Sequence, residues 1–229
     1  MYLSLDERLE FLKHKKPPTA TSEDIYRTVS FTGYRPGKLP FGNDYESEGA
    51  KKLKSALMSV FDQLFRKNYN CFLTGGAAGS DLLAADAVAE VLKSYGKRAS
   101  RSISFICLPC HDHVRRWSEK DRNYLERLLN EGTYAFYVSD RPYYQGCMQV
   151  RNRYMVDNSS MVVAVFDGQP GGTKNTLDYA EKTNKKIVTV DPFAYLRTEL
   201  FITKKDVSNH LSFLNCVNEE YRSVRYSDR

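Results

Sequence analysis

Two glycine-rich segments carry the residues of this chain that are best suited to chemistry. The first runs from Thr74 to Asp81 and the second from Asp167 to Thr176, and each follows a short apolar run and precedes a helical pattern. A strand, a glycine loop and a helix N-terminus together present unpaired backbone N–H groups and the positive end of a helix dipole to an anion. Glycine also lets the backbone come close to a phosphate. Two such loops in one chain predict a phosphorylated, nucleotide-like ligand.

Neither segment matches a well-known nucleotide fingerprint. The glycines of the first, Gly75, Gly76 and Gly79, lack the spacing of the dinucleotide motif G-x-G-x-x-G. In the second, Lys174 is wrongly spaced for the P-loop motif G-x-x-x-x-G-K-[ST]. These departures argue against a standard NAD site and against a P-loop NTPase. The alternative, that both segments are ordinary tight turns between a strand and a helix, stays open.

Side chains around these loops add groups that suit a nucleotide. Arg35 is able to bind a phosphate with two hydrogen bonds, and Tyr34 is able to stack on a base. Alternatively, Arg35 is a solvated loop charge and Tyr34 packs on the core. Asp81 either caps its own helix or accepts ribose hydroxyls, and Asp167 is placed to meet a sugar. The candidate ligand-binding residues of the loops are Thr32, Gly33, Tyr34, Arg35, Gly75, Gly76, Ala77, Gly79, Ser80, Asp81, Asp167, Gly171, Gly172, Thr173, Asn175 and Thr176.

A further polar segment, Arg151 to Ser159, precedes a buried-type strand. In a helix, Arg153 and Asp157 would stand one turn apart and form a surface pair worth about 0.3 kcal/mol. In the alternative, Asn152 and Asp157 face the ligand cleft. Asn152, Arg153 and Asp157 therefore join the candidate binding residues.

The spacing Cys107-Leu-Pro-Cys110-His111, with His113 beyond, matches haem, redox or zinc motifs on paper. Haem attachment requires export, and zinc would need four ligands within a few residues. Cys107 lies inside an apolar run and is expected to pack as a small hydrophobic residue. We therefore predict no metal and no cofactor. A role of His111 or His113 as general acid or base is a further option.

Size and composition are those of a soluble globular protein. The chain has 229 residues, of which 41% are hydrophobic and 27% charged, and five are cysteines, so no disulfide framework is implied. A net charge of +6 suits an anionic small molecule; nucleic-acid binding is possible but not indicated. No run is long enough to cross a membrane, and the first residues do not read as a signal peptide. We expect a cytoplasmic protein.

Apolar runs alternate with helical patterns along the chain, which predicts a mainly parallel sheet of about six strands covered on both faces. In such a sheet, ligands bind at the carboxyl ends of the strands. We expect an N-terminal extension over 1–27, a nucleotide-binding domain over 28–192 and a helical extension over 193–229. The strands are expected at 28–32, 70–74, 103–108, 134–138, 161–166 and 186–190, and the helices near 5–12, 50–64, 81–95, 114–128, 149–158, 174–184 and 207–221.

Five short motifs along the chain, taken together, indicate a family resemblance. They are Thr32-Gly-Tyr-Arg-Pro36, Gly75-Gly-Ala-Ala-Gly-Ser-Asp81, Pro109 to Trp117, Arg151-Asn152 with Met155-Val-Asp157, and Asp167-Gly168 with Gly171-Gly-Thr-Lys-Asn-Thr176. Together they resemble the YpsA-type members of the SLOG superfamily, which is related to the DNA-processing protein DprA and to the LONELY GUY phosphoribohydrolases. The resemblance covers about residues 28–192.

The resemblance implies a Rossmann-like α/β/α fold that binds a nucleotide or a nucleotide-derived ligand through the two glycine loops. It also implies a homodimer or higher homo-oligomer. SLOG domains of antiviral signalling bind messengers of the cyclic ADP-ribose type, so a sensor or a sequestering protein for ADP-ribose, a cyclic relative or a mononucleotide is the leading hypothesis. On this hypothesis Gly76→Asp abolishes binding and leaves the protein folded.

Two alternatives follow from the same resemblance. The phosphoribohydrolases carry P-G-G-x-G-T-x-x-E with a catalytic glutamate, whereas this chain has Pro170-Gly-Gly-Thr-Lys-Asn-Thr-Leu-Asp178, which is one position out of phase. An enzyme that cleaves an N-glycosidic bond of a nucleotide would use Asp178 or Asp157 as the acidic group and Arg151 or Arg153 as a phosphate clamp. The second alternative is single-stranded DNA binding in the manner of DprA.

Overall fold

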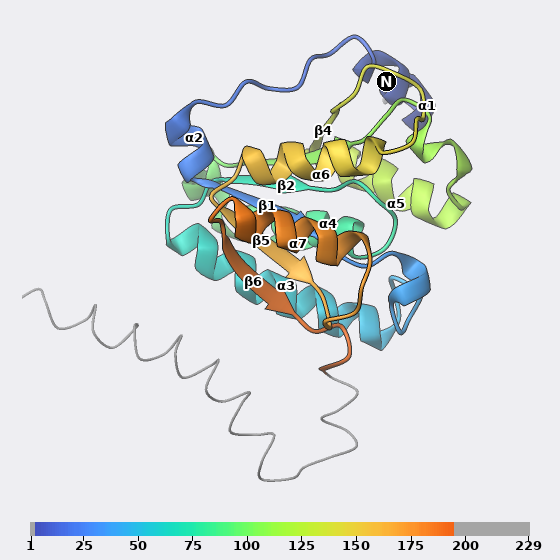
Figure 1. Cartoon of the computed structure of the whole chain (residues 1–229). Helices are drawn as coiled ribbons and strands as arrows, with labels where there is room; N and C mark the ends of the chain where they lie inside the picture. The colour runs from blue at the N-terminus through green and yellow to red at the C-terminus, as the bar shows by residue number, and fades with distance from the viewer. Residues whose placement is uncertain (1–2, 195–229) are drawn as a thin grey trace, which may run out of the picture. The chain divides into compact units, whose positions relative to one another are not determined.

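A parallel β-sheet with helices on both faces forms the described part of the protein, residues 3–194 of a computed structural model (Figure 1). The six strands are β1 (Thr28–Thr32), β2 (Cys71–Thr74), β3 (Ile103–Leu108), β4 (Tyr134–Tyr137), β5 (Met161–Val165) and β6 (Lys186–Val190). Every pair of neighbouring strands is parallel. The predicted three-layer, Rossmann-like α/β fold is confirmed.

The order of the strands decides where a ligand is expected. The sheet runs β4-β3-β2-β1-β5-β6, so the chain builds outward from β1 in one direction and then crosses back to β5. Thr32 of β1 lies beside Ala164 of β5 at the carboxyl ends of these strands. In doubly wound sheets, this reversal of direction opens a crevice where ligands bind. The loops that follow β1, β2 and β5 all lie at this carboxyl edge of the sheet.

Alternate side chains along a strand pack against the helices on the two opposite faces of the sheet. On β5, Val163 and Val165 belong to the larger core, whereas Val162 and Ala164 pack with Leu177 and its neighbours in a smaller one. This is the two-residue period of a strand buried on both faces. Figure 1 shows α6 and α7 side by side on one face of the sheet, with α3, α4 and α5 on the other.

The helices lie close to the predicted segments. Their bounds are α1 (Leu5–Leu12), α2 (Ser22–Tyr26), α3 (Glu48–Arg66), α4 (Ser80–Tyr95), α5 (Glu119–Asn130), α6 (Cys147–Asp157) and α7 (Gly172–Lys182). Short 3₁₀ turns cover Pro36–Lys38 (η1), Gly96–Ala99 (η2) and His113–Arg116 (η3). The helix predicted over 207–221 lies outside the described residues.

Two details differ from the sequence prediction. The single helix expected near 114–128 is divided, because the Ser118 side chain accepts the backbone N–H of Asp121 and so begins α5 after η3. The short helix α2 was not predicted; Thr21 and Asp24 form a capping box that starts it. In both cases a side chain that caps the backbone determines the residue at which the helix begins.

Buried α4 holds the centre of the larger core. Six of its apolar side chains are fully buried: Leu82, Leu83, Ala84, Ala85, Ala87 and Val88. Asp86 is only 2% exposed and contacts Lys54 of α3 and Arg127 of α5. This buried carboxylate thus forms a charged contact between three helices.

Helix α1 packs on the same core as the sheet. Leu5 and Leu9 are both buried in it. The backbone N–H of Leu5 donates to Glu126 at 3.0 Å, and Arg8 donates to the carbonyl of Leu129 at 3.2 Å. The first helix is therefore attached to α5 by apolar and polar contacts.

Candidate functional site

The loops after β1 and β5 are joined across the crevice by protein side chains. The Tyr34 hydroxyl donates a hydrogen bond to Asp167, and the Tyr34 ring lies edge-on to Phe166 with ring centres 6.1 Å apart. Tyr34 is only 4% exposed. It therefore packs on the core, as one of the two sequence interpretations had it, and its ring is not presented to a base.

Asp167 is committed to the same contacts. It accepts hydrogen bonds from Tyr34 and from the backbone N–H of Gln169. Burial acts to raise the pKa of Asp167, but these hydrogen bonds outweigh it and lower the pKa. An ionised Asp167 thus fixes the start of the second glycine loop beside β1.

The first glycine loop is filled by the protein itself. A Cβ added to Gly75 would stand 2.2 Å from Asp81 Oδ2 and 2.3 Å from an Arg151 nitrogen. At Gly76, where φ is +57°, it would stand 2.6 Å from Ile106. The glycines are required for close packing, so Gly76→Asp would disturb the fold as well as any ligand and does not test the site.

Backbone N–H groups of this loop are also used within the protein. Ala77 donates to Asp81 Oδ2 at 3.2 Å, Gly79 to the Tyr45 hydroxyl at 2.9 Å, and Ser80 to the Tyr34 carbonyl at 3.0 Å. Gly33 lies against Ser80, whose Oγ would be 2.2 Å from an added Cβ. Gly33, Ala77, Gly79 and Ser80 therefore hold the loops after β1 and β2 together, and Thr32 pairs with Ala164 of β5.

Asp81 and Arg151 form a buried pair beneath Gly75. Their side chains approach to 3.5 Å, and the residues are 5% and 4% exposed. Among the described residues, Asp81 Oδ1 and Arg151 Nε have no hydrogen-bond partner. Burial raises the pKa of Asp81 and lowers that of Arg151, each against the attraction of its partner. The sequence analysis left Asp81 as a helix cap or a ribose ligand and offered Arg151 as one candidate phosphate clamp; in the structure both side chains pack against Gly75.

The two candidate histidines differ in their surroundings. His113 is buried, with its Nε2 2.9 Å from the carbonyl oxygen of Gly76. Burial, assisted by the charges of Arg151 and Arg35, lowers the pKa of His113 to about 3. His111 lies against the Tyr137 ring, 4.9 Å away, beside β4. Cys107 is fully buried, as predicted.

The second glycine loop is open. A Cβ on Gly168 or Gly172 would meet no atom within 4 Å, and on Gly171 it would meet only the Lys38 amine, at 3.1 Å. Gly171 stands at the N-cap of α7, and no side chain caps this helix. The first N–H groups of α7, at Gly172 and Thr173, have no partner within the helix. This helix start is therefore free to receive an anion.

One cation lies at the open loop, and a second lies near the start of α6. The Lys38 amine donates to the Pro170 carbonyl at 2.8 Å and lies beside Gly171. Arg35, the residue before η1, places a guanidinium nitrogen 3.4 Å from the sulfur of Met148 at the start of α6, and its charge also acts on Asp81 and His113 around the first loop. The sequence prediction included Arg35 and missed Lys38. The one feature of the sequence that could have identified Lys38 is its position three residues after Arg35, since a helical turn places these two side chains on the same side.

A groove of about 390 Å³ continues from this loop between α6 and α7. Its lining residues are Met148, Gln149, Asn152, Arg153, Gly172, Asn175, Thr176, Asp178, Tyr179 and Lys182. The Asn152 amide nitrogen donates to Thr176 Oγ1 at 2.7 Å, which holds the two helices together. Five of the predicted binding residues thus share one groove, and Thr173 is buried beside it.

The two acidic catalytic candidates lie apart. Asp178 lines the groove and forms an ion pair with Lys174. Asp157 is the last residue of α6, at the opposite edge of the sheet from the glycine loops, and accepts a hydrogen bond from Tyr179. Arg153 lies over the Tyr179 ring at 5.6 Å, so the predicted surface pair of Arg153 with Asp157 is replaced by contacts of both with Tyr179.

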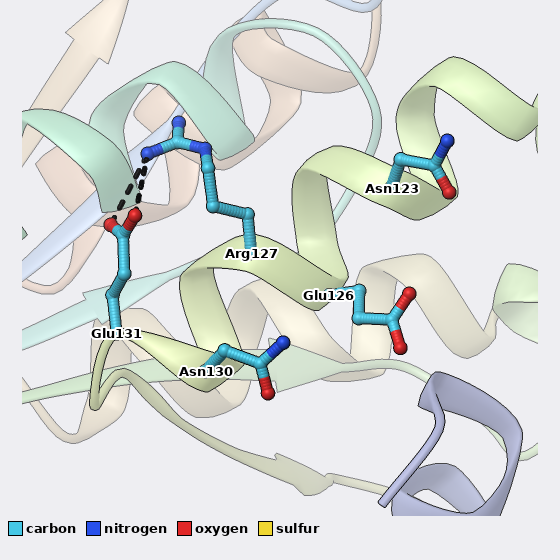
Figure 2. Close-up of a pocket in the computed structure, with 5 residues that line it drawn as sticks. All are labelled: Asn123, Glu126, Arg127, Asn130 and Glu131. Atoms are coloured by element: carbon cyan, nitrogen blue, oxygen red, sulfur yellow. Dashed lines mark hydrogen bonds and ion pairs between the residues drawn. The ribbon is translucent and has the colours of Figure 1, made fainter. Parts of the chain in front are cut away.

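A second surface depression of about 390 Å³ lies on the last turns of α5, where Arg127 pairs with Glu131 (Figure 2). Asn123, Glu126 and Asn130 complete its lining. This end of α5 precedes β4, so it lies at the amino edge of the sheet. It is remote from both glycine loops.

Among residues 3–194, no group of three histidine, cysteine or acidic side chains is arranged to hold a metal ion. In the same part of the chain, every helix is too short or too polar to cross a membrane.

Comparison with known proteins identifies similar sequences. The model of the YspA SLOG family matches residues 29–195. An SPbeta prophage-derived protein, YoqJ, of Bacillus subtilis (strain 168) is 35% identical over 144 residues, which cover 58% of this chain and 82% of that protein. A UPF0398 protein of Bacillus cereus (strain G9842) is 24% identical over 159 residues, 68% of this chain and 83% of that protein.

Two solved structures share the fold. DNA processing protein A from Helicobacter pylori, described for its single-stranded DNA binding mode, has a TM-score of 0.50 at 15% identity, covering 96% of this chain and 94% of that one. The protein of the same name from Streptococcus pneumoniae has a TM-score of 0.50 at 12% identity, covering 81% and 62%. At these identities the likeness concerns the fold alone.

Proposed function

This chain belongs to the YspA SLOG family, and on that premise we propose that it binds a phosphorylated, nucleotide-derived small molecule at the N-terminus of α7. The phosphate would lie on the N–H groups of Gly172 and Thr173, beside Lys38, and Arg35, which contacts Met148 of the groove lining, would supply a second cation. The rest of the ligand would extend into the groove between α6 and α7. The leading role for such a site is to sense or to sequester a nucleotide signal, with ADP-ribose, a cyclic relative or a mononucleotide as candidates.

One observation carries this proposal: the Lys38 amine lies beside a helix start that the protein leaves uncapped and uncrowded. A helix N-terminus favours an anion, and a cation beside it strengthens that preference. The first glycine loop offers the same sequence signal but is packed against Asp81 and Ile106. Of the two loops, the second is therefore the one that supports phosphate binding.

The groove supports a sugar-bearing ligand. Asn152, Asn175 and Thr176 line its middle with amide and hydroxyl groups, which suit ribose hydroxyls. The buried Oδ1 of Asn152 has no hydrogen-bond donor among the described residues. A ligand hydroxyl or amino group would satisfy it.

Calorimetric titration of the full chain with AMP tests the site. We expect Lys38→Gln to weaken AMP binding about tenfold, because a charge-assisted phosphate contact is lost. Gly172→Asp should abolish binding, since it sets a carboxylate at the phosphate position. Lys97→Gln is the matched control: it removes a charge from another exposed lysine, in η2 before β3, and should leave affinity unchanged. Unchanged affinity in both site variants would contradict the proposal.

The natural ligand is identified separately by mass spectrometry of small molecules released from the heat-denatured protein. An intact nucleotide supports a binding protein. A ribose phosphate or free base, together with loss of the parent compound on incubation, supports N-glycosidic hydrolysis with Asp178 as the acidic group. Asp178→Asn should then stop product formation and preserve AMP binding.

Single-stranded DNA binding is a second candidate, favoured by the fold shared with DNA processing protein A and by the net charge of +6. Phosphate contacts make such binding steeply dependent on salt. Fluorescence anisotropy with a labelled oligonucleotide measures this dependence. Tight binding that weakens steeply with salt supports this candidate, and absence of binding at low salt excludes it.

A further inference from the structure

The groove between α6 and α7 is much longer than a single phosphate. Its lining on α7 runs from Gly172 in the first turn to Lys182 at the last residue. At 1.5 Å per residue these positions are about 15 Å apart along the helix axis. A phosphate at Gly172 therefore leaves most of the groove to other parts of a ligand.

Positive charge collects at the far part of this groove. Arg153 and Lys182 are exposed there, and within residues 3–194 neither forms an ion pair. Asp178, the acidic lining residue, is neutralised by Lys174. The lining of the far part thus holds two cations without an ion-pair partner, and Asp157, which lies beside the lining, is bound to the Tyr179 hydroxyl.

Arg153 is held in place in the absence of a ligand. Its guanidinium lies over the Tyr179 ring, 5.6 Å from the ring centre, and the Tyr179 hydroxyl is bound to Asp157 at 2.8 Å. An arginine fixed on an aromatic face has less side-chain freedom to lose when it binds an anion. The middle of the groove, at Asn152 and Thr176, is neutral and forms hydrogen bonds.

From this arrangement we propose that the groove takes an elongated nucleotide-like ligand with two separated anionic groups, one at the N-terminus of α7 and the other against Arg153 and Lys182. The proposal rests on the proposed function, because the first anionic group occupies the phosphate position described there. It adds a requirement on the ligand: a second phosphate, or an equivalent anion, about 10–15 Å from the first.

Titration of the full chain with AMP, ADP and 5′-phosphorylated adenylate dimers and trimers tests this requirement. ADP carries additional charge at one end, whereas the dimer and trimer carry phosphates at increasing distance. We expect the best oligomer to bind at least about tenfold more tightly than AMP or ADP, since a second charged contact is gained. Equal affinity of AMP and the oligomers for the wild-type protein would overturn the proposal.

Variants locate the second contact. Lys182→Gln and Arg153→Gln should each reduce the advantage of the oligomer to below about threefold, and Lys182→Gln should leave AMP affinity within about twofold of wild type. Lys186→Gln, which removes an exposed charge from the nearby strand β6, is the control and should change neither. An advantage that survives in both groove variants overturns this inference while the proposed function stands. Absence of any AMP binding overturns both.

Discussion

At Gly75 an added Cβ would stand 2.2 Å from Asp81 and 2.3 Å from Arg151, whereas at Gly172 it would meet no atom within 4 Å. The two glycines stand in loops with the same sequence signature. The first is needed so that a buried ion pair fits under the backbone, and the second leaves space in front of a helix start. At the scale of single residues, the surroundings of a glycine separate a packing role from a binding role.

A pair of alanine substitutions makes this difference measurable. Gly75→Ala should cost about 1–3 kcal/mol of unfolding free energy, because the methyl group overpacks the site. Gly172→Ala should change stability by less than about 1 kcal/mol, since alanine fits there and favours the helix. Chemical denaturation of both variants checks the prediction; equal destabilisation of the two would contradict it.

His113 should make the protein sensitive to acid. Its pKa is lowered to about 3 in the folded protein, against 6.5 for the free side chain, so below pH 6.5 the unfolded chain binds a proton that the folded one does not. Stability should fall as the pH drops from about 6.5 toward 3, by about 2–3 kcal/mol at pH 4.5 from this group. The buried Asp81, whose pKa is raised, acts in the opposite direction.

The contribution of His113 is isolated by His113→Asn, which keeps a hydrogen-bonding group near the Gly76 carbonyl and removes the titration. Urea denaturation of both proteins at pH 7.5 and pH 4.5 gives the two pH-dependent losses. We expect a smaller loss in the variant. Parallel losses would assign the acid sensitivity to other groups.

At the scale of elements, a buried charge joins three helices. Asp86 of α4 is 2.7 Å from the Lys54 amine of α3, 2.8 Å from Arg127 of α5 and accepts a hydrogen bond from Tyr124 at 2.6 Å. Burial acts to raise the pKa of Asp86, but Arg127, Lys54 and Tyr124 outweigh it and lower the pKa. The Tyr124 ring stacks on Tyr45, 4.3 Å away, and the Tyr45 hydroxyl accepts the N–H of Gly79. Helix packing is thus connected to the first glycine loop.

Asp86→Asn should destabilise the protein by about 2–4 kcal/mol, because it leaves Lys54 and Arg127 near a neutral group. The estimate lies below that for fully buried pairs, since both cations keep some contact with water. Thermal unfolding measures the loss. Glu90→Gln, which removes an exposed partner of Lys54, is the control and should cost less than about 1 kcal/mol.

At the scale of the whole described part, the sheet order brings three loops to one edge of the sheet. Helix α1 packs on the core between the sheet and the helices α3, α4 and α5. Leu9→Ala should cost about 2–4 kcal/mol, because the side chain is buried in the core formed by the sheet and its helices. Phe11→Ala, at a residue that is 56% exposed, should cost much less. If both substitutions cost equally little, α1 contributes nothing to this core.

The sequence by itself determined the strands, the parallel sheet and the presence of two glycine loops at one edge, because alternating apolar runs and glycine spacing are local properties of a chain. β1, β3 and β6 begin and end at the predicted residues. The burial of Asp86 and the starts of α2 and α5 were not predicted. The tertiary structure alone decided which loop is open, because the atoms that fill the first, from Ile106 and Arg151, and the cation beside the second, from Lys38, come from distant parts of the chain.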